Sequence, residues 1–241
     1  MSAQVFGFAV LAAAAAGWVV VWRGAYRLRA PLQRLGTGPR IANYLLIALR
    51  GAASVGLVVA TLWWLEQRSG RGDVGEALAE LGLHARLPTG QVCALSALMF
   101  AACYAINLGF TSLRRTTGRR PKLVTVNLLP ETVWERVAFS LVLSPAAGIG
   151  EEIVYRGFLQ WAVAAATGDP ISAVGTQAVL FGMVHAYQGG LGILRTFALG
   201  LVLGTGTLAS GSLVPAMIAH TLLDIASGIG RTPPPARTTR D

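Results

Sequence analysis

Six ionisable side chains that could together hydrolyse an amide lie in segments made otherwise of apolar residues. They fall in three groups along the chain: Glu151, Glu152 and Arg156; His185; and His220 and Asp224. Ionised groups at membrane depth are costly unless they are paired or functional. Separate structural explanations would be needed for each group, whereas one active site accounts for them all. A carboxylate can take a proton from water while a nearby imidazole orients that water or protonates a leaving group.

The spacing of these residues leaves two chemistries open. Residues four apart share a helix face, so Glu152 can pair with Arg156 and His220 lies one turn from Asp224. In a metal-free site, a carboxylate activates water and the remaining histidine and carboxyl stabilise an oxyanion. In the alternative, Glu151, His185 and His220 bind zinc, which activates the water. A purely structural ion pair between Glu152 and Arg156 is a third interpretation.

The composition predicts a membrane protein. Apolar residues make up 54% of the 241 residues and charged residues 13%, with a mean hydropathy of +0.56, which is too apolar for an ordinary soluble domain. The net charge of +9 is concentrated in two intervals between apolar runs, as the positive-inside rule expects of cytoplasmic loops. These clusters are Arg23, Arg27, Arg29, Arg34 and Arg40, and Arg114, Arg115, Arg119, Arg120 and Lys122. We therefore expect contact with a lipid bilayer and none with nucleic acid.

The apolar runs predict an all-α, polytopic transmembrane helical bundle with seven or eight spans. A span needs about 20 mostly apolar residues. The runs cover residues 2–22, 41–65, 87–113, 137–168, 171–186, 191–208 and 213–229. Residues 2–22 are predicted to be a retained first helix rather than a cleaved signal. With the N-terminus outside, seven crossings place the arginine-rich intervals on the cytoplasmic side of the cell membrane.

The polar residues divide the chain into three parts. Residues 1–130 hold N-terminal transmembrane helices and basic loops, residues 131–230 hold the helical core with the six candidate residues, and residues 231–241 form a basic tail expected to be disordered. Gly200 and Gly204 have the spacing of a small-xxx-small pair, which allows close helix packing. Arg50 is expected to snorkel or to face a neighbouring helix. The role of Arg195, also inside a span, is left open.

Three segments around the candidate residues resemble, in order and spacing, the three motifs of the CPBP family. This is the CAAX-protease and bacteriocin-processing family of intramembrane endopeptidases, also called the Abi family. The segments are EEIVYRG at 151–157, FGMVHAYQG at 181–189 and SLVPAMIAHTLLD at 212–224. The resemblance covers roughly residues 137–230, and the first 130 residues resemble only generic membrane helices.

The resemblance implies proteolysis of membrane proteins or of prenylated or otherwise lipidated peptides. It implies that Glu151 is the general base, that Glu152 and Arg156 are its supporting pair, and that His185 helps to activate water. His220 and Asp224 would complete the site by stabilising an oxyanion or by ligating a metal. The family has been described both as metallopeptidases and as metal-free, glutamate-dependent peptidases. We favour the metal-free form, with no cofactor, and keep zinc as the alternative.

Two residues depart from the family pattern. Tyr155 stands where phenylalanine is commoner, which adds a hydroxyl that needs a partner. Asp224 stands where asparagine is frequent. An ionised Asp224 would repel an oxyanion, so it would have to be protonated, bound to His220 or bound to a metal.

Two further functional classes remain as alternatives. A non-catalytic membrane partner on the same fold, such as a bacteriocin immunity or assembly protein, would retain its function when Glu151 is replaced. A transporter could use the buried carboxylates and histidines as a proton relay.

The depth of the glutamates predicts a break in the fourth apolar run. If the crossing began at Arg136, Glu151 would lie about 22 Å into the membrane, far from His185 near the end of the returning span. We therefore expect the crossing to begin near Pro145, with residues 137–144 interfacial or re-entrant and a site that opens towards the cytoplasm.

Overall fold

The protein is described by a computed structural model, which covers residues 36–69, 74–83, 87–119 and 123–230. Within these ranges every regular element is a helix, which confirms the all-α class. In the described part of the chain, four helical segments are long and apolar enough to cross a membrane: Thr37–Arg68, Thr89–Thr116, Val133–Thr167 and Gly190–Ser210. Pro170–Val184 and Val214–Ile229 are shorter apolar helices. The expected first span at 2–22 and the tail at 231–241 lie outside the described residues, so the number of spans stays a prediction.

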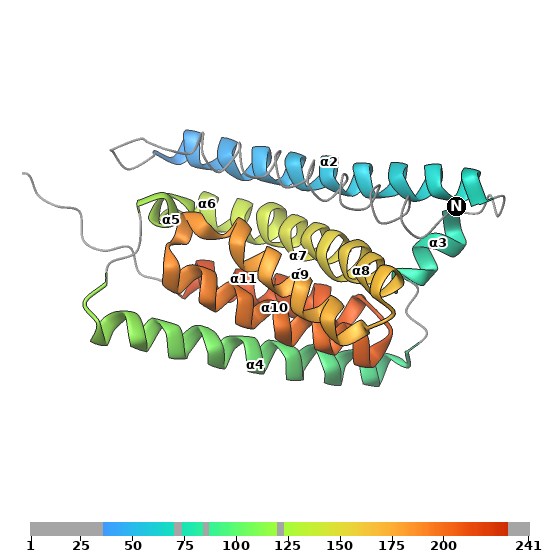
Figure 1. The fold of residues 1–241 in the computed structure, drawn as a ribbon. Coiled ribbons are helices and arrows are strands. Elements are labelled where there is room, and N and C mark those ends of the chain that lie inside the picture. The colour runs from blue at the N-terminus through green and yellow to red at the C-terminus, as the bar shows by residue number, and fades with distance from the viewer. Residues whose placement is uncertain (1–35, 70–73, 84–86, 120–122, 231–241) are drawn as a thin grey trace, which may run out of the picture.

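Two peripheral helices enclose the part of the chain that carries the candidate residues. Figure 1 shows α2 (Thr37–Ser69) along one side of the bundle and α4 (Thr89–Thr116) along the other. Between them lie the helical stretch α6 to α8 and the helices α9 (Pro170–Val184), α10 (Gly190–Ser210) and α11 (Val214–Ile229). α2 packs on α7, and α4 packs on α10 and α11. The short helices α3 (Val74–Glu80) and α5 (Leu123–Leu128) connect these layers.

The stretch from Val133 to Thr167 is helical throughout, and the predicted break at Pro145 is wrong. It comprises α6 (Val133–Ala138), the π-helical turn η1 (Phe139–Leu143), α7 (Ser144–Glu152), the π-helical segment η2 (Ile153–Leu159) and α8 (Gln160–Thr167). Proline has no N–H and its ring clashes with the carbonyl four residues before it. Here the π-turn relieves that conflict, because the N–H of Ser144 bonds to the carbonyl of Phe139 five residues back. The helix therefore continues through Pro145.

The glutamates and His185 nevertheless lie at the same level in the bundle, because they are equally far along the chain from the turn that joins α8 to α9. Gly168 ends α8 in the left-handed conformation (φ 71°), and the Asp169 side chain caps α9. Glu152 lies 16 residues before Gly168 and His185 lies 16 residues after Asp169. At 1.5 Å per residue both are about 24 Å from the turn. No re-entrant piece at 137–144 is needed for them to meet.

Close contacts at glycines hold α9 against α10. A Cβ on Gly200 would lie 3.0 Å from the Cα of Ala178, so the predicted small-xxx-small contact is present. Amide side chains bond to the carbonyls exposed there: Gln177 Nε2 donates to the Gly200 carbonyl at 2.8 Å, and Gln160 Nε2 donates to the Gly204 carbonyl at 3.2 Å. Both amides are buried. The Gln177 bond fixes the register of α9, which His185 directly follows, and the Gln160 bond joins α8 to α10.

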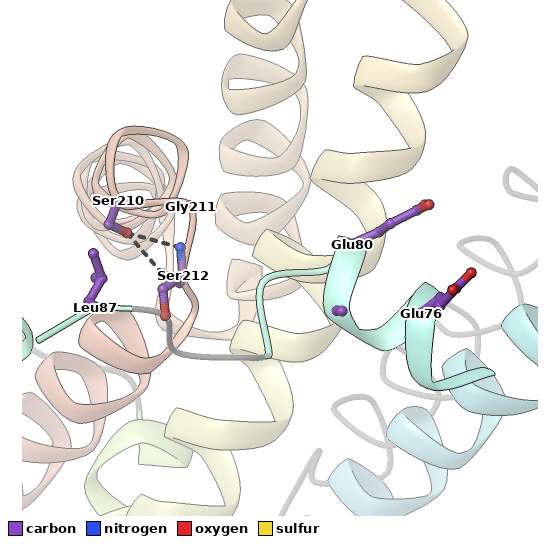
Figure 2. A pocket seen from close by; sticks show the side chains of 7 residues that line it. Glu76, Glu80, Leu87, Ser210, Gly211 and Ser212 are labelled. Atoms are coloured by element: carbon purple, nitrogen blue, oxygen red, sulfur yellow. Dashed lines mark hydrogen bonds between the residues drawn. The ribbon is translucent and has the colours of Figure 1, made fainter. Parts of the chain in front are cut away.

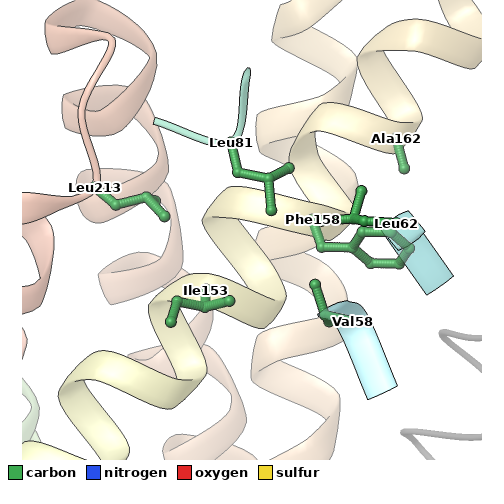
Figure 3. Close-up of a cluster of buried hydrophobic side chains, with 7 residues drawn as sticks. All are labelled: Val58, Leu62, Leu81, Ile153, Phe158, Ala162 and Leu213. Atoms are coloured by element: carbon green, nitrogen blue, oxygen red, sulfur yellow. The ribbon is translucent and has the colours of Figure 1, made fainter. Parts of the chain in front are cut away.

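An apolar cluster fixes the segment that follows the two glutamates. Figure 3 shows side chains from α2, from the chain after α3, from η2 and α8, and from the start of α11 converging on one another. The buried members are Val58, Leu62, Leu81, Ile153, Phe158, Ala162 and Leu213. Because Ile153 directly follows Glu152, this packing restrains the helix that presents both carboxylates.

The prediction that the first basic interval is a cytoplasmic loop is wrong at Arg40, which lies in a helix. Its side chain is 1% exposed and lies on α2. Its Nη1 donates to Glu135 Oε2 at 2.8 Å and its Nη2 lies 3.3 Å from Glu131 Oε1. Glu135 itself is the third residue of α6 and forms a capping box with Thr132. Arg40, which was predicted to lie in a cytoplasmic loop, therefore joins α2 to the start of α6.

Candidate active site

Four elements bring the six candidate residues together. Glu151 and Glu152 end α7, and Arg156 follows one turn later in η2. His185 lies directly after α9, while His220 and Asp224 lie one turn apart on α11.

Glu152 is the buried centre of the cluster. Its side chain has no exposed surface, and its Oε1 accepts hydrogen bonds from Arg156 Nη1 at 3.0 Å and from His220 Nδ1 at 2.7 Å. Charge-assisted bonds of this kind are stronger than those between neutral groups. Among the described residues its Oε2 has no hydrogen-bond partner. The pair expected from the four-residue spacing is thus present, and it holds His220 as well.

The hydrogen bond between His220 and Glu152 directs the other ring nitrogen of His220 towards two more accessible carboxylates. With Nδ1 bonded to Glu152, Nε2 lies 4.0 Å from Glu151 Oε2 and 3.8 Å from Asp224 Oδ2. The Glu151 and Asp224 side chains are each 33% exposed. Glu151 is therefore the glutamate that water or a substrate can reach, and Glu152 is the one that cannot be reached.

His185 is oriented by the end of its own helix. Its Nδ1 lies 2.7 Å from the backbone carbonyl of Phe181. A carbonyl only accepts, so Nδ1 carries the proton and donates it. In the neutral imidazole Nε2 then has a lone pair available to accept a proton or to bind a metal.

The ring of Phe181 packs against several residues in and around the site, whereas its spacing in the sequence indicated a contact with His185 alone. The centroid of its ring lies 4.7 Å from that of His185, 6.1 Å from that of His220 and 5.2 Å from that of Tyr155. The guanidinium carbon of Arg156 lies 4.1 Å from the same ring, a cation–π contact. The sequence placed Phe181 one turn before His185 but assigned it no role. Its ring sets the separation of the two imidazoles.

Close packing of α11 against the α6 to α8 stretch explains why His220 reaches Glu152. A Cβ on Gly148 would lie 2.7 Å from the backbone nitrogen of Thr221, the residue after His220. A Cβ on Gly157 would lie 3.1 Å from Leu213 Cδ1. Glycine at these positions allows the two backbones to approach closely enough for the histidine to bond to a buried carboxylate.

Glu151, His185 and His220, which would bind zinc in the alternative mechanism, are not grouped as a metal centre among the described residues. Among the described residues, no three His, Cys, Asp or Glu side chains are grouped so that they could hold a metal ion. No reaction step is therefore derived through a metal, and the zinc alternative stays a prediction.

A cavity of about 470 Å³ lies elsewhere, beside α3 and the turn between α10 and α11. Figure 2 shows the glutamates of α3 and the serines of this turn around it. Its lining residues are Glu76, Ala79, Glu80, Leu87, Ser210, Gly211 and Ser212. None of the six candidate residues lines it, and His220 follows the lining residue Ser212 by eight residues. The cavity is therefore separate from the six candidate residues.

Fold and site together define a helical membrane protein with a buried glutamate, histidine and arginine cluster. The model of the family described as type II CAAX prenyl endopeptidase Rce1-like matches residues 132–226. This segment of the chain is therefore similar to the CPBP family, to which that model corresponds, as the three motifs indicated. The family is one of proteases that act on prenylated, membrane-associated substrates. A comparison with curated proteins gave no match, and neither did one with solved structures.

Proposed function

We propose that this protein is an intramembrane endopeptidase that hydrolyses a peptide bond in membrane-associated, prenylated or otherwise lipidated protein substrates. The observation that carries the proposal is the position of His220. Its Nδ1 is bonded to the buried Glu152, and its Nε2 lies between the more accessible Glu151 and Asp224. All of these residues fall within the segment that matches the protease family.

Glu151 is the general base in this proposal. Its carboxylate takes a proton from a water molecule, whose oxygen attacks the carbonyl carbon of the scissile bond. His185 Nε2 accepts a hydrogen bond from the same water and so orients it. When the tetrahedral intermediate collapses, the C–N bond breaks and protonated Glu151 returns the proton to the leaving amine.

His220 completes the site by stabilising the oxyanion. In its protonated form it donates from Nδ1 to Glu152 and from Nε2 towards the site, where the developing oxygen charge can accept the bond. Arg156 compensates the charge of Glu152 and so holds this arrangement in place. In this proposal Asp224, whose carboxylate lies 3.8 Å from His220 Nε2, favours the protonated imidazole by its charge and does not act as an oxyanion donor.

The test is cleavage of a fluorogenic, prenylated C-terminal peptide by the purified protein in proteoliposomes. Glu151→Gln keeps the size of the side chain but removes the base, and His185→Ala removes the water-orienting group. Each should lower kcat by roughly 100-fold or more, the usual range for general acid–base groups. Glu76→Gln changes an exposed glutamate of α3 that is not among the six candidate residues; it is the matched control and should cleave like the wild type.

A Glu151→Gln variant that is folded and fully active would overturn the assignment. If that variant instead retains biological function in cells while the wild type cleaves no peptide, the protein is a non-catalytic membrane partner. Proton-coupled flux in the same proteoliposomes would indicate a transporter.

Whether the protein requires a metal ion can be measured separately. We expect the purified protein to contain no stoichiometric zinc and to keep its activity after chelator treatment. Stoichiometric zinc, lost together with activity on chelation and restored by zinc alone, would replace the metal-free mechanism.

A further inference from the structure

A row of polar side chains outside the six motif residues leads from α4 to the turn that follows His185. Arg195 Nη1 on α10 donates to Asn107 Oδ1 on α4 at 3.2 Å, and its Nη2 donates to Gln188 Oε1 at 2.6 Å. Gln188 Nε2 in turn donates to the hydroxyl of Tyr187 at 3.1 Å. The chemistry assigned to the motif residues uses none of these four side chains.

The order of donors and acceptors fixes the direction of the last bond. A guanidinium has donors only, so the carbonyl end of the Gln188 amide must face Arg195 and the NH2 end must face Tyr187. The Tyr187 oxygen is then an acceptor in that bond, and its own proton points elsewhere. Gln188 is also confined sterically, because a Cβ on Gly192 would collide with Gln188 Cβ.

The Tyr187 hydroxyl lies in the surroundings of the candidate site. Its ring centroid is 5.7 Å from that of His185. The charges of Glu151 and Asp224 both act on it, as does that of Arg195. Within the described part of the chain, Gln188 is the only hydrogen-bond partner of this hydroxyl. Its proton is therefore available to a group that enters the site beside His185.

The site as built from the motif residues lacks a neutral donor. An ionised Asp224 can only accept hydrogen bonds, so it cannot donate one to an oxyanion. A tyrosine hydroxyl is a donor that carries no charge at neutral pH.

We propose that the Tyr187 hydroxyl donates a hydrogen bond to the carbonyl oxygen of the scissile peptide bond, and that Gln188 and Arg195 are positioning residues that turn its proton towards the substrate. The inference rests on the proposed peptidase function. It deepens that function by naming a substrate-contacting residue that the motif comparison did not supply.

The test compares Tyr187→Phe, Gln188→Glu and the double variant with wild type, using the same prenylated peptide in proteoliposomes. Tyr187→Phe should lower kcat roughly 100-fold, as expected for loss of one oxyanion donor, and change KM by less than about twofold, since the bond strengthens mainly in the transition state. Tyr104→Phe is the matched control: this tyrosine lies on α4, is 43% exposed, and stacks on Phe100. It should cleave like the wild type.

Gln188→Glu separates orientation from mere packing. The carboxylate keeps the length of the side chain and its partner Arg195, but it can only accept, so it draws the Tyr187 proton away from the substrate. We expect a kcat loss similar to that of Tyr187→Phe with unchanged thermal stability. The double variant should lose no more than either single change, because both remove the same bond.

Three outcomes would overturn the inference: Tyr187→Phe with wild-type kcat, additive losses in the double variant, or a loss confined to Tyr155→Phe, the other tyrosine near Glu151. Failure of the proposed function looks different. In that case wild type and Glu151→Gln would be equally inactive on the peptide, which overturns the proposed function and, with it, the inference that rests on it.

Discussion

Glu152 Oε1 accepts a hydrogen bond from His220 Nδ1 at 2.7 Å and at the same time from Arg156 Nη1 at 3.0 Å. One buried oxygen thereby links α7, η2 and α11. The carboxylate is fully buried, so its charge is tolerated only because a cation lies against it. His220 is thus oriented by a group that does not itself face the accessible part of the site.

Removing Arg156 should therefore destabilise the protein as well as inactivate it. Arg156→Ala removes the guanidinium from the buried Glu152 and leaves only His220 bonded to it, and breaking a buried pair by removing one partner costs about 3–5 kcal/mol. Arg68→Ala is the control, because Arg68 is exposed on α2 and stacks over Trp64 at 4.8 Å, a contact worth under about 1 kcal/mol. Denaturation of both variants in the same detergent measures the difference. Equal, small losses would mean that the pair is not needed for folding.

The buried Arg40 should behave in the same way at the other end of the α6 to α8 stretch. Arg40→Ala leaves Glu135, which has no exposed surface, without its cation. We expect a loss of about 3–5 kcal/mol. Arg115→Ala, at the exposed end of α4, should change stability by less than about 0.5 kcal/mol. If both variants unfold alike, the buried network does not contribute to stability.

Apolar runs predicted the helices well, because membrane spans are defined by length and hydropathy. The run at 191–208 corresponds to α10, Gly190–Ser210, and the run at 213–229 to α11, Val214–Ile229. Hydropathy could not predict that Arg40 is buried, because its partner Glu135 lies 95 residues away. Nor could it predict a helix that continues through Pro145, because the π-turn that permits this depends on the backbone.

Within the site, spacing predicted local pairs and left the long-range bonds undetermined. The four-residue interval indicated the Glu152–Arg156 pair, which is present at 3.0 Å. Which of two adjacent glutamates bonds to His220 depends on how α11 is rotated against α7, and that rotation is set by contacts such as Gly148 with Thr221. The ring contacts of Phe181 could not be predicted from spacing either, because the residues that it contacts lie in η2, directly after α9 and on α11.

Asp169 provides a test of pH dependence outside the spans. The backbone N–H of Ile171, together with Ser172, bonds to its carboxylate and holds the pKa of Asp169 below its ordinary value. The stability gained from this cap is therefore fully present above the ordinary pKa of about 3.9 and is lost as the pH falls through the lower pKa of the folded protein.

Asp169→Ala should accordingly lower the Tm at pH 7, and the difference from wild type should shrink as the pH is lowered below about 3.9. Asp169→Asn is the control, because asparagine also caps helices but does not titrate in this range. Its Tm difference from Asp169→Ala should stay constant with pH. A wild-type advantage over Asp169→Ala that persists unchanged at low pH would contradict the role of the carboxylate.

Gly148 should be the glycine at which a single methyl group damages the site without touching a candidate residue. A Cβ there would lie 2.7 Å from the Thr221 backbone nitrogen, so Gly148→Ala must push α11 away from α7 and with it His220. We expect a loss of about 1–3 kcal/mol from overpacking and a kcat at least tenfold lower. Gly175→Ala, on α9 with nothing within 4 Å of the added Cβ, should be neutral or slightly stabilising, because alanine favours helix over glycine. Cleavage and thermal denaturation of the two variants separate the cases. A Gly148→Ala variant that cleaves like Gly175→Ala would show that His220 tolerates displacement of its helix.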